Sequence, residues 1–171
     1  NTEDLQKVAG MFKRFEQLSG TVLNKSKCKV MGLGGWRGRE DWPLPWLQPV
    51  DHQKIFGIIW YTTVKETVKQ TWLECEGKVH NCLMAWKAKP VHTLTQRAFV
   101  LKTFATSKLW YLAQVLPISK ATIQYLEQQV GQFMWKGHLE RLPLQELYLD
   151  HKQGGLGLPN ISAKADSLFL M

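Results

Sequence analysis

Apolar residues recur every three or four positions at the start of the chain. The pattern covers residues 3–18 and predicts an amphipathic helix. Its apolar positions include Leu5, Val8, Phe12 and Phe15. Two short apolar runs follow, at 27–33 and 54–60, and predict strands separated by a loop rich in glycine and proline. The second run is apolar almost throughout, so we expect it to be buried on both faces.

After residue 62 the spacing returns to three or four residues. Residues 64–86 predict a long helix that ends before Pro90, and residues 94–116 predict a second one that Pro117 ends. A third helix, with a serine at its N-cap, is predicted over 119–133. The tail beyond it is less regular. These elements together predict an α+β chain, with a helix and short strands followed by a bundle of three helices.

The helix predicted over 94–116 has an apolar stripe and an opposite polar arc when its residues are projected at about 100° each. The stripe consists of Leu94, Ala98, Leu101, Ala105, Leu109, Leu112 and Leu116. We expect it to face the core. Two large aromatic residues, Phe99 and Trp110, fall on the polar arc. Either another segment of the protein covers them, or a base or sugar of a nucleic acid rests on them.

Basic residues lie on both edges of this stripe. Arg97 and Lys108 share one edge and Lys102 lies on the other. From these positions the charges can reach phosphates, or the side chains can extend along the apolar surface with only their charged heads in water.

The composition favours a nucleic-acid partner. The 171 residues include 22 Lys and Arg against 14 Asp and Glu, a formal net charge of +8, and the isoelectric point is near 9.5. Such a charge attracts polyanions, with an acidic membrane surface as the second candidate. Three cysteines at these spacings suit neither a disulfide framework nor a zinc site, which predicts a reduced intracellular setting. No apolar run is long enough to span a membrane, so no membrane partner is expected.

The sequence contains no evident catalytic centre. The adjacent acidic pairs, Glu3 with Asp4 and Glu40 with Asp41, lack the strand context of a two-metal site. The glycines within 154–157 have neither of the common phosphate-loop spacings. Basic residues follow Trp36, Trp86 and Trp135, three of the eight tryptophans, directly in the sequence.

Five segments, in order, resemble the reverse transcriptases of non-LTR retrotransposons (LINEs). FEQLSGTVLNKSKCKV (15–30) is similar to the fourth palm motif, in which an Asn and a Lys follow a helix that ends in Ser-Gly. KIFGIIW (54–60) resembles the next motif, a hairpin that holds the primer end. LTQRAFVLKTFATSKLWY (94–111) resembles the thumb helix. FMWKG (133–137) and HKQGGLGLPNI (151–161) resemble the pattern after the thumb. The match runs in the right order over nearly the whole chain. It is most similar to the LINE-1 and Tx1-like branch of this family.

The resemblance implies three parts: the end of the polymerase palm in 1–62, a helical thumb in 63–137 and a post-thumb segment in 138–171. The parent enzyme is an RNA-directed DNA polymerase that primes on a nicked target site. It holds two Mg²⁺ ions with aspartates of the first and third palm motifs, the latter containing Asp-Asp. Since no Asp-Asp occurs here, we expect the metal-binding residues, the fingers and most of the palm to lie upstream, outside this chain. The chain alone is not expected to polymerise DNA.

The resemblance assigns roles only to residues that match its motifs. Lys27 matches a lysine proposed to protonate the pyrophosphate leaving group as a general acid, although it is equally a surface lysine at the start of a strand. The other matched positions are Asn24 in the fourth motif, Phe56 and Gly57 in the primer-holding hairpin, and Arg97 and Lys102 in the thumb. Lys108 and Trp110 are added as nucleic-acid contacts from the helix projection.

The implied partners are an RNA template, a DNA primer or target, and the upstream palm and fingers, in the cytoplasm and nucleus. Two other functions fit the same sequence. One is a degenerate or domesticated nucleic-acid-binding module without enzymatic activity. The other is a helical protein-interaction domain unrelated to retroelements, which would show no salt-dependent binding to nucleic acid.

Overall fold

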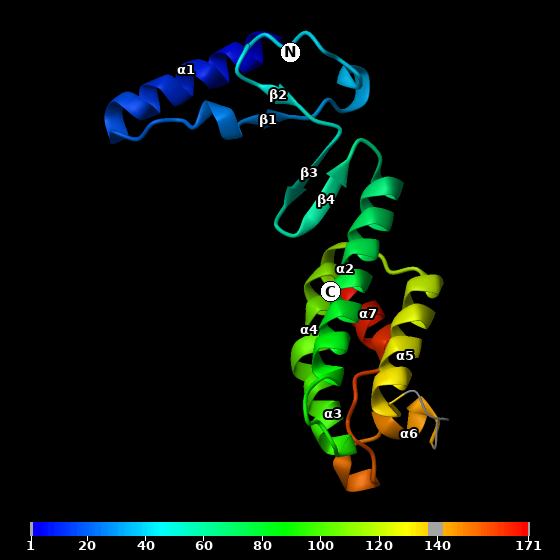
Figure 1. Cartoon of the computed structure of the whole chain (residues 1–171). Helices are drawn as coiled ribbons and strands as arrows, with labels where there is room; N and C mark the ends of the chain where they lie inside the picture. The colour runs from blue at the N-terminus through cyan, green and yellow to red at the C-terminus, as the bar shows by residue number, and fades with distance from the viewer. Residues whose placement is uncertain (1, 137–141, 171) are drawn as a thin grey trace. The chain divides into compact units, whose positions relative to one another are not determined.

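The computed structural model describes residues 2–136 and 142–170, in two compact units (Figure 1). The first unit ends at Thr67 and the second begins at Val68, five residues beyond the boundary expected at 62/63. All the described strands belong to the first unit, and helices build the second. The chain therefore mixes helix and sheet, as an α+β class requires.

The first unit contains one long helix and two small strand pairs. Its elements are α1 (Thr2–Ser19), the 3₁₀ turns η1 (Lys25–Lys27) and η2 (Gly34–Trp36), and the strands β1 (Lys29–Val30), β2 (Gln48–Pro49), β3 (His52–Ile55) and β4 (Ile58–Tyr61). β1 pairs with β2 in parallel, and β3 pairs with β4 in antiparallel register. The helix predicted over 3–18 is confirmed.

Both strand predictions in this unit need correction. The strand predicted over 27–33 has only two residues, because η1 occupies the start of that run. The run 54–60 is a hairpin, with Phe56 and Gly57 as its two-residue turn. A glycine inside an apolar run was the signal of this turn, since glycine adopts positive φ without steric cost. A hairpin at this position is also what the resemblance implies.

The hairpin is not buried on both faces, contrary to the prediction from its apolar run. Ile58 is only 3% exposed, but Ile55 is 44% and Phe56 85% exposed. The cause is the size of the sheet, because a two-stranded ribbon has no second layer to cover its other face.

The apolar side chains of α1 are also largely uncovered. Met11, Phe15 and Leu18 are 71%, 59% and 80% exposed. The periodicity thus predicts the helix correctly, whereas the described part of the chain does not supply a partner that buries its apolar face.

The second unit is a bundle of helices. Its elements are α2 (Val64–Lys87), which begins in the first unit, α3 (Leu94–Val100), the π-helical turn η3 (Leu101–Ala105), α4 (Ser107–Val115), α5 (Lys120–Met134), α6 (Leu144–Tyr148), the 3₁₀ turn η4 (His151–Gln153) and α7 (Ile161–Phe169). The helices predicted over 64–86 and 119–133 are present as α2 and α5. None of the helices in the described ranges combines the length and apolarity needed to cross a bilayer. Gly137, the last residue of the FMWKG match, lies outside the described residues.

The helix predicted over 94–116 is not one regular α-helix. At η3 the Thr106 amide donates to the Leu101 carbonyl at 2.8 Å, and the Thr106 hydroxyl donates to the same oxygen at 3.1 Å. An amide that donates to the carbonyl five residues earlier adds one residue to that helical turn. The side chains after the turn are therefore rotated about the helix axis. Apolar periodicity alone does not reveal such an insertion.

The predicted stripe of this helix nevertheless forms the core. Leu101 and Ala105 are fully buried, and Leu109 is 1% exposed; Leu94, at the helix start, is 36% exposed. α7 packs against α4 and α5, and Figure 1 shows it within the bundle. The end of the chain, expected as a separate post-thumb segment, thus supplies part of this core.

Candidate nucleic-acid interface

The hairpin tip presents an aromatic ring from an unfavourable backbone conformation. Phe56 has φ +49° and Gly57 has φ +82°, the two positive values that a type I′ turn requires. Glycine tolerates this conformation, but a residue with a Cβ pays about 1–2 kcal/mol for it, and asparagine is the preferred exception. An apolar residue that is 85% exposed gains nothing from burial at this position. Backbone outliers of this kind are found mostly at functional sites.

Asn24 and Lys27 lie at the 3₁₀ turn between α1 and β1. The Asn24 side-chain oxygen accepts from the Ser26 hydroxyl at 2.6 Å, and its carbonyl accepts from the amide of Lys27 at 3.0 Å. Asn24 therefore shapes the turn. The Lys27 side chain is exposed at the end of this turn, in reach of a ligand that approaches the first unit from solvent.

Arg97 is buried and bonded to backbone. It is 8% exposed, and its guanidinium donates to the Met134 carbonyl, to the His92 carbonyl at 3.1 Å and to the Val91 carbonyl at 3.5 Å. Burial lowers the pKa of the Arg97 guanidinium from its usual range, although an arginine stays charged at any physiological pH. These carbonyls lie at helix ends within the bundle, and Arg97 connects them. Arg97 therefore has the geometry of a structural residue more than that of a free phosphate contact.

The other three predicted residues of the long helix occupy different environments. Lys102 is half-buried, with its ammonium 3.4 Å from where a Cβ on Gly157 would lie. Lys108 is exposed on α4. Trp110 is partly covered, because the Lys164 ammonium of α7 lies 4.3 Å from its ring centroid. Lys108 is thus the most accessible of them.

Of the two aromatic residues on the polar arc, only Phe99 remains open. Its side chain is 61% exposed, and its ring makes an edge-on approach to Phe104 with centroids 6.4 Å apart. Trp110 thus fits the alternative in which another segment covers the aromatic residue, whereas Phe99 presents its ring to solvent.

The helical unit contains a long basic segment without acidic residues. Between Glu76 and Glu127 there are 50 residues without a single Asp or Glu, and they include seven cations. These are Lys78, Lys87, Lys89, Arg97, Lys102, Lys108 and Lys120. Most lysines of this segment are exposed, namely Lys78, Lys87, Lys89, Lys108 and Lys120, whereas Lys102 is half-buried. The positions of the acids in the sequence are enough to locate this basic segment.

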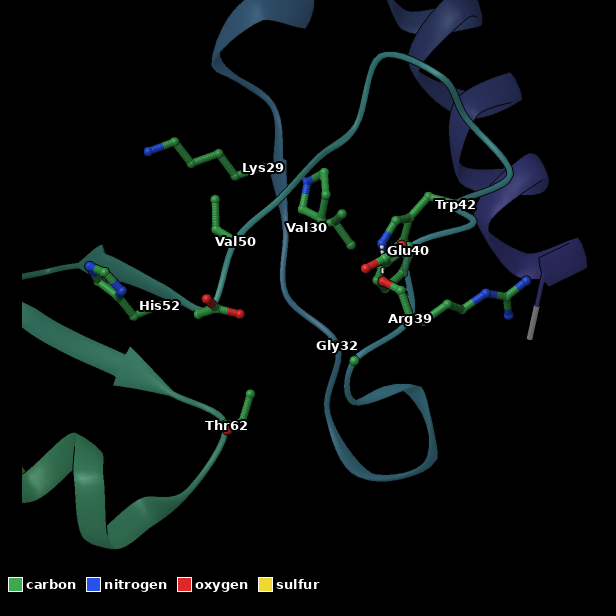
Figure 2. Close-up of a pocket in the computed structure, with 12 residues that line it drawn as sticks. Lys29, Val30, Gly32, Arg39, Glu40, Trp42, Val50, His52 and Thr62 are labelled. Carbon is green, nitrogen blue, oxygen red and sulfur yellow. Dashed lines mark hydrogen bonds between the residues drawn. The ribbon is translucent and has the colours of Figure 1, made fainter.

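A pocket in the first unit is lined by side chains of both charges. Its volume is about 520 Å³, and none of the predicted site residues lines it. In Figure 2, Lys29 and His52 lie on one side, and Arg39, Glu40 and Trp42 lie on the other. The Arg39 guanidinium is already engaged, 2.9 Å from the Asp41 carboxylate and 4.4 Å from the Trp36 ring centroid. Its opposing charges give this pocket no preference for an anion.

The described residues do not fit the Mg²⁺ site that the resemblance implies. The sequence has no Asp-Asp, and among the described residues no three His, Cys, Asp or Glu side chains come together as metal ligands. The buried Cys75 is a poor candidate for metal binding or nucleophilic chemistry, since burial raises the pKa of its thiol to about 11.

No family model matches this chain, and no curated protein sequence matches it.

The backbone conformation of the hairpin tip leads to a test. Phe56→Asn should stabilise the hairpin by about 1 kcal/mol, because asparagine tolerates positive φ better than phenylalanine. Hydrogen exchange of the hairpin amides should slow by about 5-fold. Phe56→Ala is the matched control, since it removes the ring but keeps a side chain that disfavours positive φ. Equal exchange rates in Phe56→Asn and the unmodified chain would show that the tip does not hold this conformation.

Proposed function

We propose that this chain is the end of the palm, the thumb and the post-thumb segment of a non-LTR retrotransposon reverse transcriptase, and that it binds the primer–template. The upstream palm and fingers of the same polyprotein complete the enzyme and hold its Mg²⁺. An RNA template and a DNA primer are the partners, in the cytoplasm and nucleus. By itself the chain does not polymerise DNA.

The observation that carries this proposal is the hairpin tip. An exposed phenylalanine in a positive-φ position costs stability and buries no apolar surface within the described chain, and we infer that its benefit comes from a ligand. The order of sequence motifs supports the same conclusion, since the Phe-Gly pair stands where the family's primer-holding hairpin is expected. An aromatic ring can pack against a sugar or a terminal base of the primer.

The helical unit provides the second part of the contact. A segment of 50 residues with seven cations and no acid presents positive potential to a phosphate backbone. Among the predicted residues Lys108 is free to contact phosphate, and Lys102 lies beside the Gly157 loop. Arg97 contributes by holding the helices in place, because its donors are directed at backbone carbonyls.

Lys27 has the chemistry for a role in nucleotide addition. A lysine ammonium can donate a proton to the pyrophosphate oxygen that develops negative charge, and its own charge stabilises that oxygen. Its exposed position on η1 leaves the ammonium accessible. The proposal places it at the active site only once the upstream palm is present.

Binding to primer–template tests the proposal directly. The chain should bind a fluorescently labelled RNA–DNA heteroduplex with a recessed primer end, and the anisotropy titration should be strongly salt-dependent. With about four phosphate contacts the affinity should fall about 100-fold between about 50 and 200 mM salt. Phe56→Ala should weaken binding with little change in the salt slope, because the ring carries no charge. Binding that is absent, or independent of salt, would favour the protein-interaction alternative.

The role of Lys27 requires the parent enzyme. In a protein that joins this chain to its upstream palm, Lys27→Ala should slow single-turnover nucleotide addition by about 10²-fold or more, the size expected for loss of a general acid. Primer–template affinity should stay near normal. Lys25→Ala, on the same turn, is the control and should leave the rate unchanged. An unchanged rate in Lys27→Ala would assign that lysine to the surface alone.

A nucleic-acid-binding module without activity is the second candidate, and the acid-free basic segment is compatible with it. The coding sequence upstream of Asn1 separates the two. An open frame with the aspartate motif identifies the polymerase, whereas a stop codon or an unrelated exon identifies a remnant or a domesticated module.

A further inference from the structure

A basic pocket lies where the ends of α2 and α5 meet the start of α3. Its volume is about 270 Å³, slightly below the range of about 300–1,000 Å³ typical of small-molecule sites. The residues that line it are Trp86, Lys87, Lys89, Val91, Arg97, Phe133 and Lys136. Four of them are cations and none is an acid. A pocket of this size and charge suits one phosphodiester group with part of its sugar.

The helix ends at this pocket do not account for so much positive charge. The C-terminal end of a helix carries a partial charge of about −0.5, and cations there are stabilised by it. α2 and α5 both end here, at Lys87 and Met134, so they offset about one of the four positive charges. The Arg97 guanidinium donates to backbone carbonyls, which carry no net charge to neutralise it. A surplus of about three charges is left for an anion.

Three aromatic rings continue from the pocket onto the surface. The Lys89 ammonium lies 4.2 Å from the Trp86 ring centroid, and Trp86 contacts Phe104 with centroids 5.0 Å apart. Phe104 in turn meets the edge of Phe99. Phe104 is 37% and Phe99 61% exposed. Solvent-facing rings next to lysines are the combination that binds unpaired bases and their phosphates.

We propose that this basic aromatic pocket binds an unpaired stretch of a nucleic-acid strand. The phosphodiester lies among Lys87, Lys89 and Lys136, and a neighbouring base stacks on Phe99. A duplex hides its base faces between neighbouring pairs, so only an unpaired strand uses the rings and the charges together. An acidic peptide would satisfy the lysines but leave the exposed ring without a partner. The inference rests on the proposed function only for the class of partner, since the hairpin tip and Lys27 belong to the other unit.

The test uses the full chain and a fluorescein-labelled single-stranded RNA of about 12 nucleotides, followed by anisotropy. Lys87→Gln/Lys89→Gln should weaken binding about 10-fold at about 100 mM salt and make the salt slope shallower by about 1.4, the value for two lost contacts to a single strand. The matched control, Lys65→Gln/Lys69→Gln, removes two exposed lysines from the beginning of α2, outside the acid-free segment. It should stay within about 2-fold of the unmodified chain.

The aromatic part of the site has its own variant. Phe99→Ala should weaken binding of the single strand about 5-fold or more, in line with the loss of one stacked base. The salt slope should not change. Because Phe99 is exposed on the surface, its truncation leaves the core intact, and circular dichroism verifies the fold of each variant.

Three results would overturn the inference. Equal losses in the two double variants would indicate non-specific attraction by the net charge. Competition by polyglutamate as strong as that by RNA of equal charge would indicate an acidic-peptide site. A blunt heteroduplex that binds as tightly as the single strand, with the same loss in Lys87→Gln/Lys89→Gln, would exclude a site for unpaired strand. The last result would contradict the inference but not the proposed function. The proposed function would fail if the chain bound the single strand but not the heteroduplex.

Discussion

The helical unit depends on the buried guanidinium of Arg97. It joins the connection between α2 and α3, through the carbonyls of Val91 and His92, to the end of α5, through the carbonyl of Met134. Carbonyls at a helix end have no partner within the helix, and a charged donor satisfies them more strongly than a neutral one. A side chain that is 8% exposed thus holds three segments at one end of the bundle. The basic pocket is lined by residues of the same segments.

Charge and packing are separated in this unit. The apolar stripe of α3, η3 and α4 fills the core, so the lysines of the acid-free segment are left at the surface. These lysines can form ion pairs only with acids outside the segment, as Lys78 does with Glu74. The segment itself contains no acid that offsets the repulsion between its lysines. A polyanion would relieve this repulsion. The proposed function therefore assigns this positive charge to binding and not to stability.

The helices with their core positions, and the cap of α5, could be predicted from sequence, because both depend on local spacing. Apolar residues at three- and four-residue intervals predict α1, α2 and α5 and place Leu101 and Leu109 in the core. The cap of α5 by Ser119, whose side chain accepts from the Thr122 amide, is equally local. The positive φ of Phe56 was not predictable from an apolar run, because it depends on how two short strands pair. The π-helical turn at η3 was missed because the apolar residues keep spacings of three or four residues on both sides of it.

The candidate site was only partly predictable, because burial of a polar residue depends on distant segments. Arg97 was expected at a phosphate, yet its partner Met134 is 37 residues away. Trp110 is covered by Lys164, from a tail whose packing no local pattern revealed. Phe99 shares the same polar arc and stays open. Lys87 and Lys89 adjoin Trp86 in the sequence, but only the folded bundle brings Phe133 and Lys136 to them.

The central claim is that the acid-free helical segment is the surface on which this protein holds nucleic acid. Lysine-acylation footprinting by mass spectrometry tests it most directly, because one experiment reports on every lysine in the free and the bound chain. With a primer–template that carries a single-stranded overhang, protection should be concentrated at Lys87, Lys89 and Lys108, while Lys7 and Lys13 of α1 stay as reactive as in the free chain. Uniform protection of all lysines, or protection confined to α1, would contradict the account.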